Sequence, residues 1–288
     1  MSTGNGTPRT AFVLAGGGSF GAVQVGMLHE LAAFGVVPDM VVGSSAGAIN
    51  GAYFAGAPNA EGIARLDAIW RGLNRREVFP ITWRSVAGFV MRRLPVVDPS
   101  GLRTLLERHL AYKELEHAAV PVHVVATDLL HGGTVTLSNG NAVESVLASA
   151  AIPAAFPPVR IGERLLVDGA IAGNTPVGVA VELGAERIIV LPTGYACDLK
   201  EAPRGAIACG LHAITLLTAH QLVAQIERFQ DQVEIVTVPP LCPLSVSPYD
   251  FSHGGELIDR AAGQTKKWLG NGGLEKHRIP GALRPHVD

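Results

Sequence analysis

The chain is poor in charged residues and in cysteine. Only 17% of its 288 residues are Asp, Glu, Lys or Arg, and the formal net charge is −2. So small a charge gives no electrostatic basis for binding nucleic acid. The three cysteines, Cys197, Cys209 and Cys242, are widely spaced and match neither a disulfide framework nor a C-x-x-C metal motif. This cysteine usage is typical of a protein in a reducing compartment.

The sequence also lacks a secretory leader and a membrane-spanning run. Its first residues, MSTGNGTPRT, are polar and small, without the basic and apolar regions of a signal peptide. A bilayer crossing needs ~20 apolar residues. The longest candidate, residues 205–223, is interrupted by His212, His220 and Gln221. We therefore expect a cytoplasmic protein, with at most peripheral contact at a membrane surface.

Apolar runs rich in Val and Ile alternate with helical patterns. The expected strands are residues 10–15, 40–43, 121–126, 133–137, 164–167, 187–192 and 233–238. The expected helices are residues 21–34, 46–56, 60–72, 100–110, 141–150, 176–183, 206–230 and 255–269. This alternation predicts an α/β fold, a three-layer α/β/α sandwich with a mostly parallel central sheet. We expect one domain over residues 8–270, followed by a C-terminal tail, 271–288, in which residues 278–288 are poorly ordered.

Residues 74–98 interrupt this alternation. They hold five arginines and the aromatic residues Phe79, Trp83 and Phe89, with no clear strand. One interpretation is a surface helical excursion whose aromatic side chains pack on the domain. The other is a lid or interfacial segment, with the aromatic side chains at a lipid boundary and the arginines at anionic head groups.

A glycine-rich motif, GGGSFG, follows the first expected strand at residues 16–21. Its spacing fits the G-x-G-x-x-G loop of dinucleotide-binding proteins. Such a site needs an acidic residue at the end of the second strand. Asp39 instead precedes the apolar run 40–42. A dinucleotide-dependent oxidoreductase is therefore the weaker hypothesis.

The second apolar run ends in GSSAG, residues 43–47, before a helical pattern. This is a G-x-S-x-G motif in the strand-to-helix setting of a nucleophile elbow, with Ser45 at its centre. Gly43 and Gly47 leave room for the sharp turn, and the positive end of the following helix points at Ser45. The motif favours an enzyme with a serine nucleophile.

A serine nucleophile gives the first glycine motif a role. Acyl transfer produces an oxyanion, which backbone N–H groups can stabilise. Gly17 and Gly18 supply such donors, and the N–H of Ala46 is a further candidate. The two motifs together predict an acyl hydrolase.

The motifs described so far do not identify the residue that would act as the base for Ser45. The usual order of serine, acid and histidine would draw on a histidine after Ser45. The candidates are His212, His220, His253, His277 and His286, of which His253 has the best setting. Asp168 follows an apolar strand, and apolar neighbours would raise its proton affinity. Asp128 in VVATDLL also lies at a strand end.

The motifs GGGSFG, GSSAG and DGA, in this order at strand ends, resemble those of the patatin-like phospholipases. Further similarity lies in ATDL (126–129), SAAIPAAFPPV (149–159) and NTP (174–176), so the resemblance covers residues 10–195. It implies hydrolysis of fatty-acyl ester bonds in phospholipids or related lipids, with no cofactor and no metal. A non-hydrolytic or acyl-transferring member of the same fold is the alternative.

The resemblance also assigns roles. Family members use a Ser–Asp dyad without histidine, which implies Ser45 as nucleophile and Asp168 as base. The implied oxyanion loop consists of Gly16, Gly17, Gly18 and Gly21. One departure concerns Phe20, which stands where the family often has Arg or Lys before the last glycine of the loop.

Overall fold

The computed structural model describes residues 8–74, 97–153, 155–194, 205–242, 244, 246–275 and 279–283. The strands are β1 (Thr10–Leu14), β2 (Met40–Ser44), β3 (Val122–Asp128), β4 (Thr134–Leu137), β5 (Val159–Ile161), β6 (Arg164–Asp168), β7 (Arg187–Leu191) and β8 (Glu234–Thr237). The helices are α1 (Gly21–Ala33), α2 (Ala46–Gly56), α3 (Ala60–Gly72), α6 (Ser100–His109), α7 (Ala142–Ser149), α8 (Ala170–Gly173), α9 (Val177–Glu182), α10 (Ala206–Phe229) and α11 (Gly254–Gly270). Nearly all of residues 74–98, for which a surface excursion and a lid were the two interpretations, lies outside the described residues.

Every expected strand and helix is present, with ends shifted by at most two residues. The sequence analysis did not anticipate β5 and α8. They span only three and four residues, too few for a hydrophobic period to be visible.

The strands form one sheet in the order β5-β6-β3-β2-β1-β7-β8, with β4 also paired to β3. The run from β3 through β2, β1 and β7 to β8 is parallel, whereas β4, β5 and β6 pair antiparallel. The expected mostly parallel sheet is confirmed.

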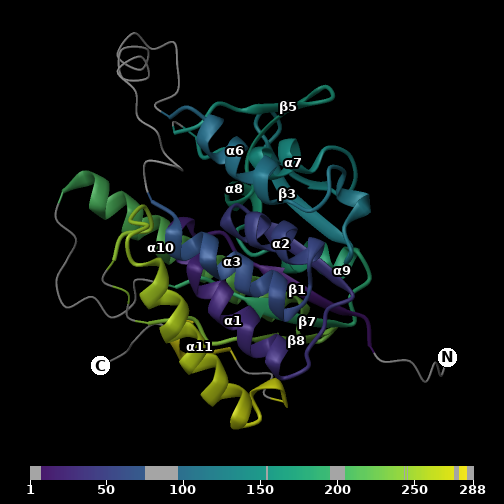
Figure 1. The fold of residues 1–288 in the computed structure, drawn as a ribbon, viewed down its shortest axis with the longest axis vertical. Helices are drawn as coiled ribbons and strands as arrows, with labels where there is room; N and C mark the ends of the chain where they lie inside the picture. Colours follow the sequence, from purple (N-terminus) through teal and green to yellow (C-terminus); the bar gives the residue numbers. More distant parts are fainter. Residues whose placement is uncertain are drawn as a thin grey trace.

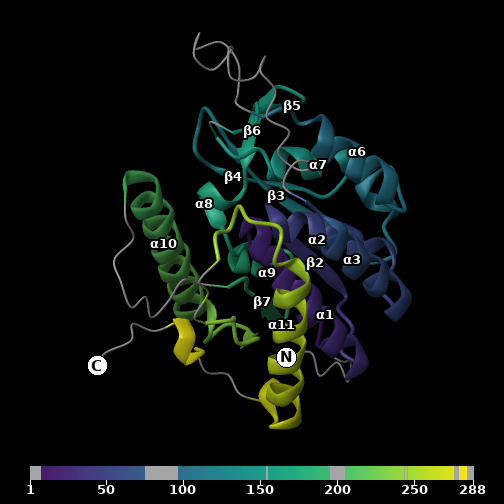
Figure 2. The same cartoon turned by 60° about the vertical axis from the view of Figure 1, so that its left-hand side comes forward.

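Alternate residues of the strands enter two cores on opposite faces of the sheet. Phe12 and Leu14 of β1 pack in the core beneath α1, α2, α3, α6 and α11, whereas Ala11 and Val13 pack in the core beneath α9 and α10. Figure 2 shows α10 on the left, α1, α2 and α3 on the right, and α11 in the middle of the view. This arrangement confirms the three-layer α/β/α sandwich (Figure 1).

The strands β2 and β6 meet head to head along one edge of β3. Residues 124–127 of β3 pair with β4, so β2 and β6 both lie on the other edge. There Ser44, the last residue of β2, pairs with Val125, and Asp168, the last residue of β6, pairs with Ala126. Because β6 runs antiparallel, the carboxyl ends of both strands arrive at neighbouring positions. This junction brings Ser45 and Asp168 together.

Three further features bear on the sequence-based expectations. Leu283 of the expected tail is buried, and it packs in the core beneath α9 and α10, so this part of the tail is ordered.

Cys242 is disulfide-bonded, which removes the support that the cysteine pattern gave to a reducing compartment. Within the described residues, no helix combines the length and apolarity required to cross a bilayer.

Candidate active site

Ser45 forms a strained turn between β2 and α2. Its φ of 54° and ψ of −122° make it the one non-glycine residue with positive φ in the described part of the chain. A Cβ atom on Gly43 would lie 2.4 Å from the carbonyl oxygen of Gly47, and one on Gly47 would lie 2.2 Å from that of Leu14. The spacing of the motif therefore has a steric cause, since side chains at either glycine would obstruct the turn.

Ser45 and Asp168 are hydrogen-bonded. The Ser45 Oγ donates to Asp168 Oδ2 at 2.7 Å, and the backbone N–H of Ala170 donates to Asp168 Oδ1 at 2.8 Å. Asp168 is only 3% exposed. Its desolvation raises the pKa of the carboxyl from 3.8 to about 6, although the hydrogen bonds from Ser45 and Ala170 favour the charged form. A carboxylate in this position can take a proton from the Ser45 hydroxyl.

Gly169 fits the close approach at the strand junction. A Cβ atom there would lie 2.1 Å from the carbonyl oxygen of Val125 and 2.7 Å from Ser44 Oγ. Asp168 is thus followed by glycine because the chain passes directly against β3 after the junction.

Asp128 and the described histidines are placed elsewhere. The Asp128 carboxylate accepts the backbone N–H groups of Leu130 and His131 at the turn after β3. Partial desolvation raises the pKa of Asp128, but these hydrogen bonds outweigh it and leave the pKa below its ordinary value. His253 contacts Asp250 and Glu256. Neither of the two cavities that reach Ser45 includes a described histidine in its lining.

The GGGSFG loop is held rigidly beside Ser45. The N–H of Gly16 donates to the carbonyl of Asn174 at 3.0 Å, and Thr193 Oγ1 donates to the carbonyl of Gly16 at 3.0 Å. The N–H of Gly21 donates to the carbonyls of Gly18 and Ser19. Two of the four glycines expected to form the oxyanion loop therefore already use their N–H groups.

The remaining donors are at Gly17, Gly18 and Ala46. In the part of the chain that the structure describes, no intramolecular acceptor is found for their backbone N–H groups. Ala46 also begins α2, whose positive end favours negative charge beside Ser45. These three groups can stabilise an oxyanion next to Ser45 Oγ.

A buried polar chain links the glycine loop to its surrounding helices. The Trp70 indole donates to Asn50 Oδ1 at 2.8 Å, and Asn50 donates to Gln24 Oε1 at 2.8 Å and to the carbonyl of Gly21 at 2.9 Å. Gln24 in turn donates to the carbonyl of Ala15 at 2.8 Å. The chain thus ties both ends of the loop to α1, α2 and α3. Hydropathy periods carry no signal for such long-range pairs, so the sequence analysis missed it.

Ser149, at the end of α7, holds the backbone of Ser45 in place, and the sequence analysis also missed it. Its Oγ accepts the N–H of Ser45 at 2.9 Å and donates to the carbonyl of Val125 at 2.5 Å. It is fully buried. It lies within the stretch SAAIPAAFPPV, which the sequence analysis noted without assigning it a role.

We expect Ser149→Ala to lower kcat for a soluble ester by about tenfold, because an unpaired buried N–H costs ~1–3 kcal/mol and loosens the turn at Ser45. KM should change little. Steady-state kinetics test this, with Ser145→Ala as the matched control on the same helix. Among the described residues, the acceptor found for Ser145 Oγ is the carbonyl of Asn141. Equal kcat losses in the two variants would contradict the assigned role of Ser149.

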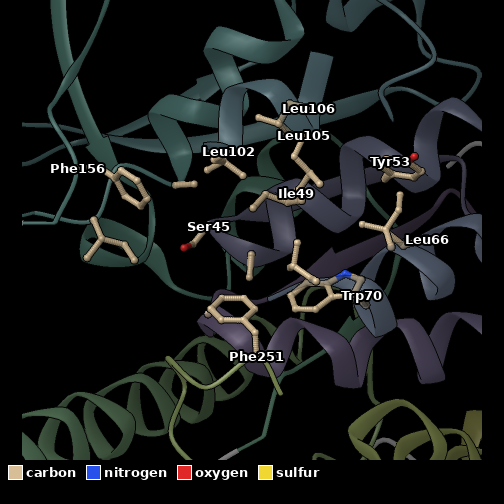
Figure 3. Close-up of a pocket in the computed structure, with 16 residues that line it drawn as sticks. Ser45, Ile49, Tyr53, Leu66, Trp70, Leu102, Leu105, Leu106, Phe156 and Phe251 are labelled. Atoms are coloured by element: carbon tan, nitrogen blue, oxygen red, sulfur yellow. The ribbon is translucent and has the colours of Figure 1, made fainter. Parts of the chain in front are cut away.

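Two cavities meet at Ser45. One, of about 60 Å³, is lined almost entirely by apolar side chains from α2, α3, α6 and the chain around Phe251. Figure 3 shows Ser45 on its left side and Tyr53 and Leu66 on its right, with Ile49 and Trp70 between them. The other is a cleft of about 540 Å³ that also contains Asp168.

The cleft has a mixed lining. Its polar side chains come from Asn174, Thr193, Thr215, Thr218, Gln221 and Tyr249. Burial, and the nearby charge of Asp168, raise the pKa of Tyr249 above its ordinary value. Within the described residues, no cluster of His, Cys, Asp or Glu suited to a metal ion is found. The expectation that no metal is needed stays a prediction.

A profile of the patatin-like phospholipase family matches residues 12–181. An uncharacterized NTE family protein of Mycobacterium tuberculosis is 32% identical over 170 residues, covering 58% of this chain and 27% of that protein. Mouse patatin-like phospholipase domain-containing protein 7 is 28% identical over 196 residues, covering 67% of this chain and 14% of that protein. The chain therefore matches less than a third of the length of either relative.

Among solved structures, VipD from Legionella pneumophila is similar with a TM-score of 0.50 and 15% identity, covering 94% of this chain and 67% of VipD. At this identity the likeness shows a shared fold. The family profile spans more than half of the chain and includes both Ser45 and Asp168. The chain belongs to the patatin-like phospholipase family.

Proposed function

We propose that this protein is a serine acyl hydrolase that cleaves fatty-acyl esters of lipids through Ser45 and Asp168. The observation that carries the proposal is the hydrogen bond of 2.7 Å from Ser45 Oγ to the buried Asp168 carboxylate. Membership of the patatin-like phospholipase family supports lipid esters as the substrate class.

The proposed reaction has two halves. In the first, Asp168 takes the Ser45 proton while Oγ attacks the ester carbonyl, and the N–H groups of Gly17, Gly18 and Ala46 stabilise the oxyanion. The protonated Asp168 then donates this proton to the leaving alkoxide, and an acyl-serine ester remains. In the second half, Asp168 accepts a proton from water, and the resulting hydroxide attacks the acyl carbon. The Ser45 oxygen leaves, recovers the proton, and the fatty acid is released.

The two cavities suggest how a substrate lies. The narrow apolar cavity suits an acyl chain, which gains by leaving water and needs no hydrogen-bond partner. The wider cleft has hydroxyl and amide groups that suit the alcohol part of the ester. The scissile carbonyl would lie at Ser45, where the two cavities meet.

The apolar cavity can be tested by narrowing it. Ile49 lies between Ser45 and the distal residues Tyr53 and Leu66 (Figure 3). We expect Ile49→Phe to lower kcat/KM for a laurate ester by about tenfold or more relative to an acetate ester, since each displaced methylene loses apolar burial. Hydrolysis of matched p-nitrophenyl esters measures this ratio.

The matched control for this variant is Ile214→Phe, in the lining of the wider cleft. It should leave the laurate-to-acetate ratio near that of the wild type. Retained acetate hydrolysis shows that Ile49→Phe folds. An unchanged ratio in Ile49→Phe would place the acyl chain elsewhere.

The direct test of the proposed function is labelling with a fluorophosphonate, combined with measured fatty-acid release from a lipid ester. We expect stoichiometric labelling at Ser45 and release of free fatty acid. A protein that is labelled but releases no acid to water, only to an alcohol acceptor, would instead be an acyltransferase.

A further inference from the structure

Asn174, the residue that follows α8, is buried directly against the glycine loop. It is only 4% exposed, and its backbone carbonyl accepts the N–H of Gly16 at 3.0 Å. A Cβ atom on Gly16 would lie 2.5 Å from Asn174 Oδ1 and 3.1 Å from Ser45 Cβ. The side-chain amide of Asn174 is therefore a close neighbour of the nucleophile.

The same amide lines the cleft that contains Ser45 and Asp168. In the part of the chain that the structure describes, no hydrogen bond of the Asn174 side chain is found. Buried amides normally have partners for their donor and acceptor atoms, because an unpaired polar group away from water is costly. The Asn174 amide is thus available to a ligand in the cleft.

Gln221 of α10 supplies a second amide to this cleft. Its Oε1 is buried, and no donor to this atom is found among the described residues. Thr218, one turn earlier in the same lining, differs because its hydroxyl donates to the carbonyl of Thr215 at 2.9 Å. The fold therefore leaves the hydrogen-bonding capacity of Asn174 and Gln221 unused.

We propose that Asn174 and Gln221 bind free hydroxyl groups on the alcohol part of the ester, so that the preferred substrate is an uncharged fatty-acyl ester of a polyol. The inference rests on the proposed function, in which this cleft receives the alcohol part. An amide offers both a donor and an acceptor, and a hydroxyl group can pair with either. The match holds whichever way each amide is turned.

The charge of the cleft disfavours a phosphate in the same position. Among the described residues of the lining, Asp168 is the one with a charged side chain, and its charge is negative when it acts as a base. A phosphate would be repelled by this carboxylate, more strongly than in bulk water because the site is partly desolvated. Phosphate oxygens that carry no proton also accept hydrogen bonds without donating any, so the oxygen of each amide would stay unpaired. A hydroxyl group meets neither obstacle.

The test compares three soluble hexanoate esters at pH 8, namely 1-hexanoylglycerol, its 3-phosphate and propyl hexanoate. We expect wild-type kcat/KM to be about tenfold or more higher for the glycerol ester than for either of the others. The propyl ester has no hydroxyl group to pair with the amides, and the phosphate adds a negative charge. Asn174→Ala should lower the preference for the glycerol ester over the propyl ester by about tenfold, and Gln221→Leu should lower it in the same direction.

Thr218→Val is the matched control in the same lining, since the Thr218 hydroxyl is already paired. It should leave the glycerol-to-propyl ratio near that of the wild type. The propyl ester reports any loss that Asn174→Ala causes through the glycine loop, and a thermal melt shows whether the variant folds. Equal losses on both esters would make Asn174 a support of the loop alone and would overturn the hydroxyl site. A wild-type preference for the phosphate ester would overturn the uncharged substrate.

The ether 1-O-hexylglycerol cannot be hydrolysed, so its binding tests the hydroxyl site without the reaction. Calorimetry should show binding about tenfold weaker in Asn174→Ala than in the wild type. Ether binding that depends on Asn174, without hydrolysis of any ester, supports the hydroxyl site and refutes the hydrolase. Hydrolysis of the esters together with ether binding that ignores Asn174 refutes the hydroxyl site alone.

Discussion

Ser45→Ala is expected to abolish fluorophosphonate labelling and to lower ester hydrolysis by about 10⁴-fold or more, because the attacking oxygen is removed while the fold is retained. The wild-type turn has a side chain at Ser45 with φ of 54°, and alanine keeps the same Cβ. The melting temperature should therefore stay close to that of the wild type. Gel-based labelling, p-nitrophenyl ester kinetics and a thermal melt measure these three quantities.

Ser44→Ala is the matched control, one residue away. Ser44 is fully buried, and no hydrogen-bond partner of its hydroxyl is found among the described residues. Removing a hydroxyl that has no partner should cost little stability and less than about threefold in rate. Substantial turnover in Ser45→Ala, or an equal loss in Ser44→Ala, would end the assignment of Ser45 as nucleophile.

Asp168→Asn is the second variant with a large expected effect. It keeps the shape of the side chain but removes the carboxylate that would accept the Ser45 proton. General-base catalysis contributes ~10²- to 10⁴-fold, so kcat should fall by this range. His253→Gln should lower kcat by less than about threefold, because His253 pairs with acidic residues outside both cavities. A loss in His253→Gln as large as that in Asp168→Asn would make the histidine the base.

The pKa of Asp168 also predicts the pH dependence. The carboxylate must be ionised to accept a proton, and burial raises its pKa to about 6. Wild-type kcat/KM, which reports ionisation of the free enzyme, should therefore fall about tenfold for each pH unit below about 6 and level off above it. The measurement is a pH–rate profile with a soluble ester. A profile that is flat down to pH ~4, near the ordinary pKa of a carboxyl, would contradict a desolvated Asp168.

The same pKa predicts that Asp168→Asn stabilises the fold at pH 8. The folded pKa of about 6 lies above the ordinary value of 3.8, so the folded state binds the proton more tightly than the unfolded state does. The favourable contribution is complete below the ordinary value and is lost as the pH rises through about 6. The difference corresponds to about 3 kcal/mol, which the uncharged variant would recover as a melting temperature several degrees higher. A lower melting temperature would instead mean that the ionised carboxylate stabilises the junction.

The strands and helices could be located in the sequence because most of them are long and strongly apolar. Residues 46–56 and 60–72 were expected as helices with the bounds that α2 and α3 show. The elbow at Ser45 was equally visible, since its steric requirements fall on Gly43 and Gly47, two residues away on each side. Local sterics of this kind depend on neighbours in the chain, so they leave a motif.

The choice between Asp128 and Asp168 could not be made in the same way. Both follow apolar strands, and alternation of side chains does not reveal the direction in which a strand joins the sheet. The sequence analysis did not foresee that β6 runs antiparallel to β3. Asp168 lies within 2.7 Å of Ser45 because β2 and β6 meet head to head on β3. That junction depends on the pairing of Ser44 with Val125 and of Asp168 with Ala126, residues that are far apart in the chain.

The GGGSFG loop, expected to bind the oxyanion, depends on both local sterics and long-range contacts. Its glycines mark a place where the backbone approaches a neighbour closely, and this feature can be seen in the local sequence. Which N–H groups are left to bind an anion depends on distant partners. The N–H of Gly16 donates a hydrogen bond to the carbonyl of Asn174. Gly17 and Gly18 instead line the cavities that contain Ser45. Residue types and short spacings thus specify the chemistry that the chain can perform, whereas the long-range contacts of the folded sheet select the atoms that can perform it, because only folding sets their distances and their burial.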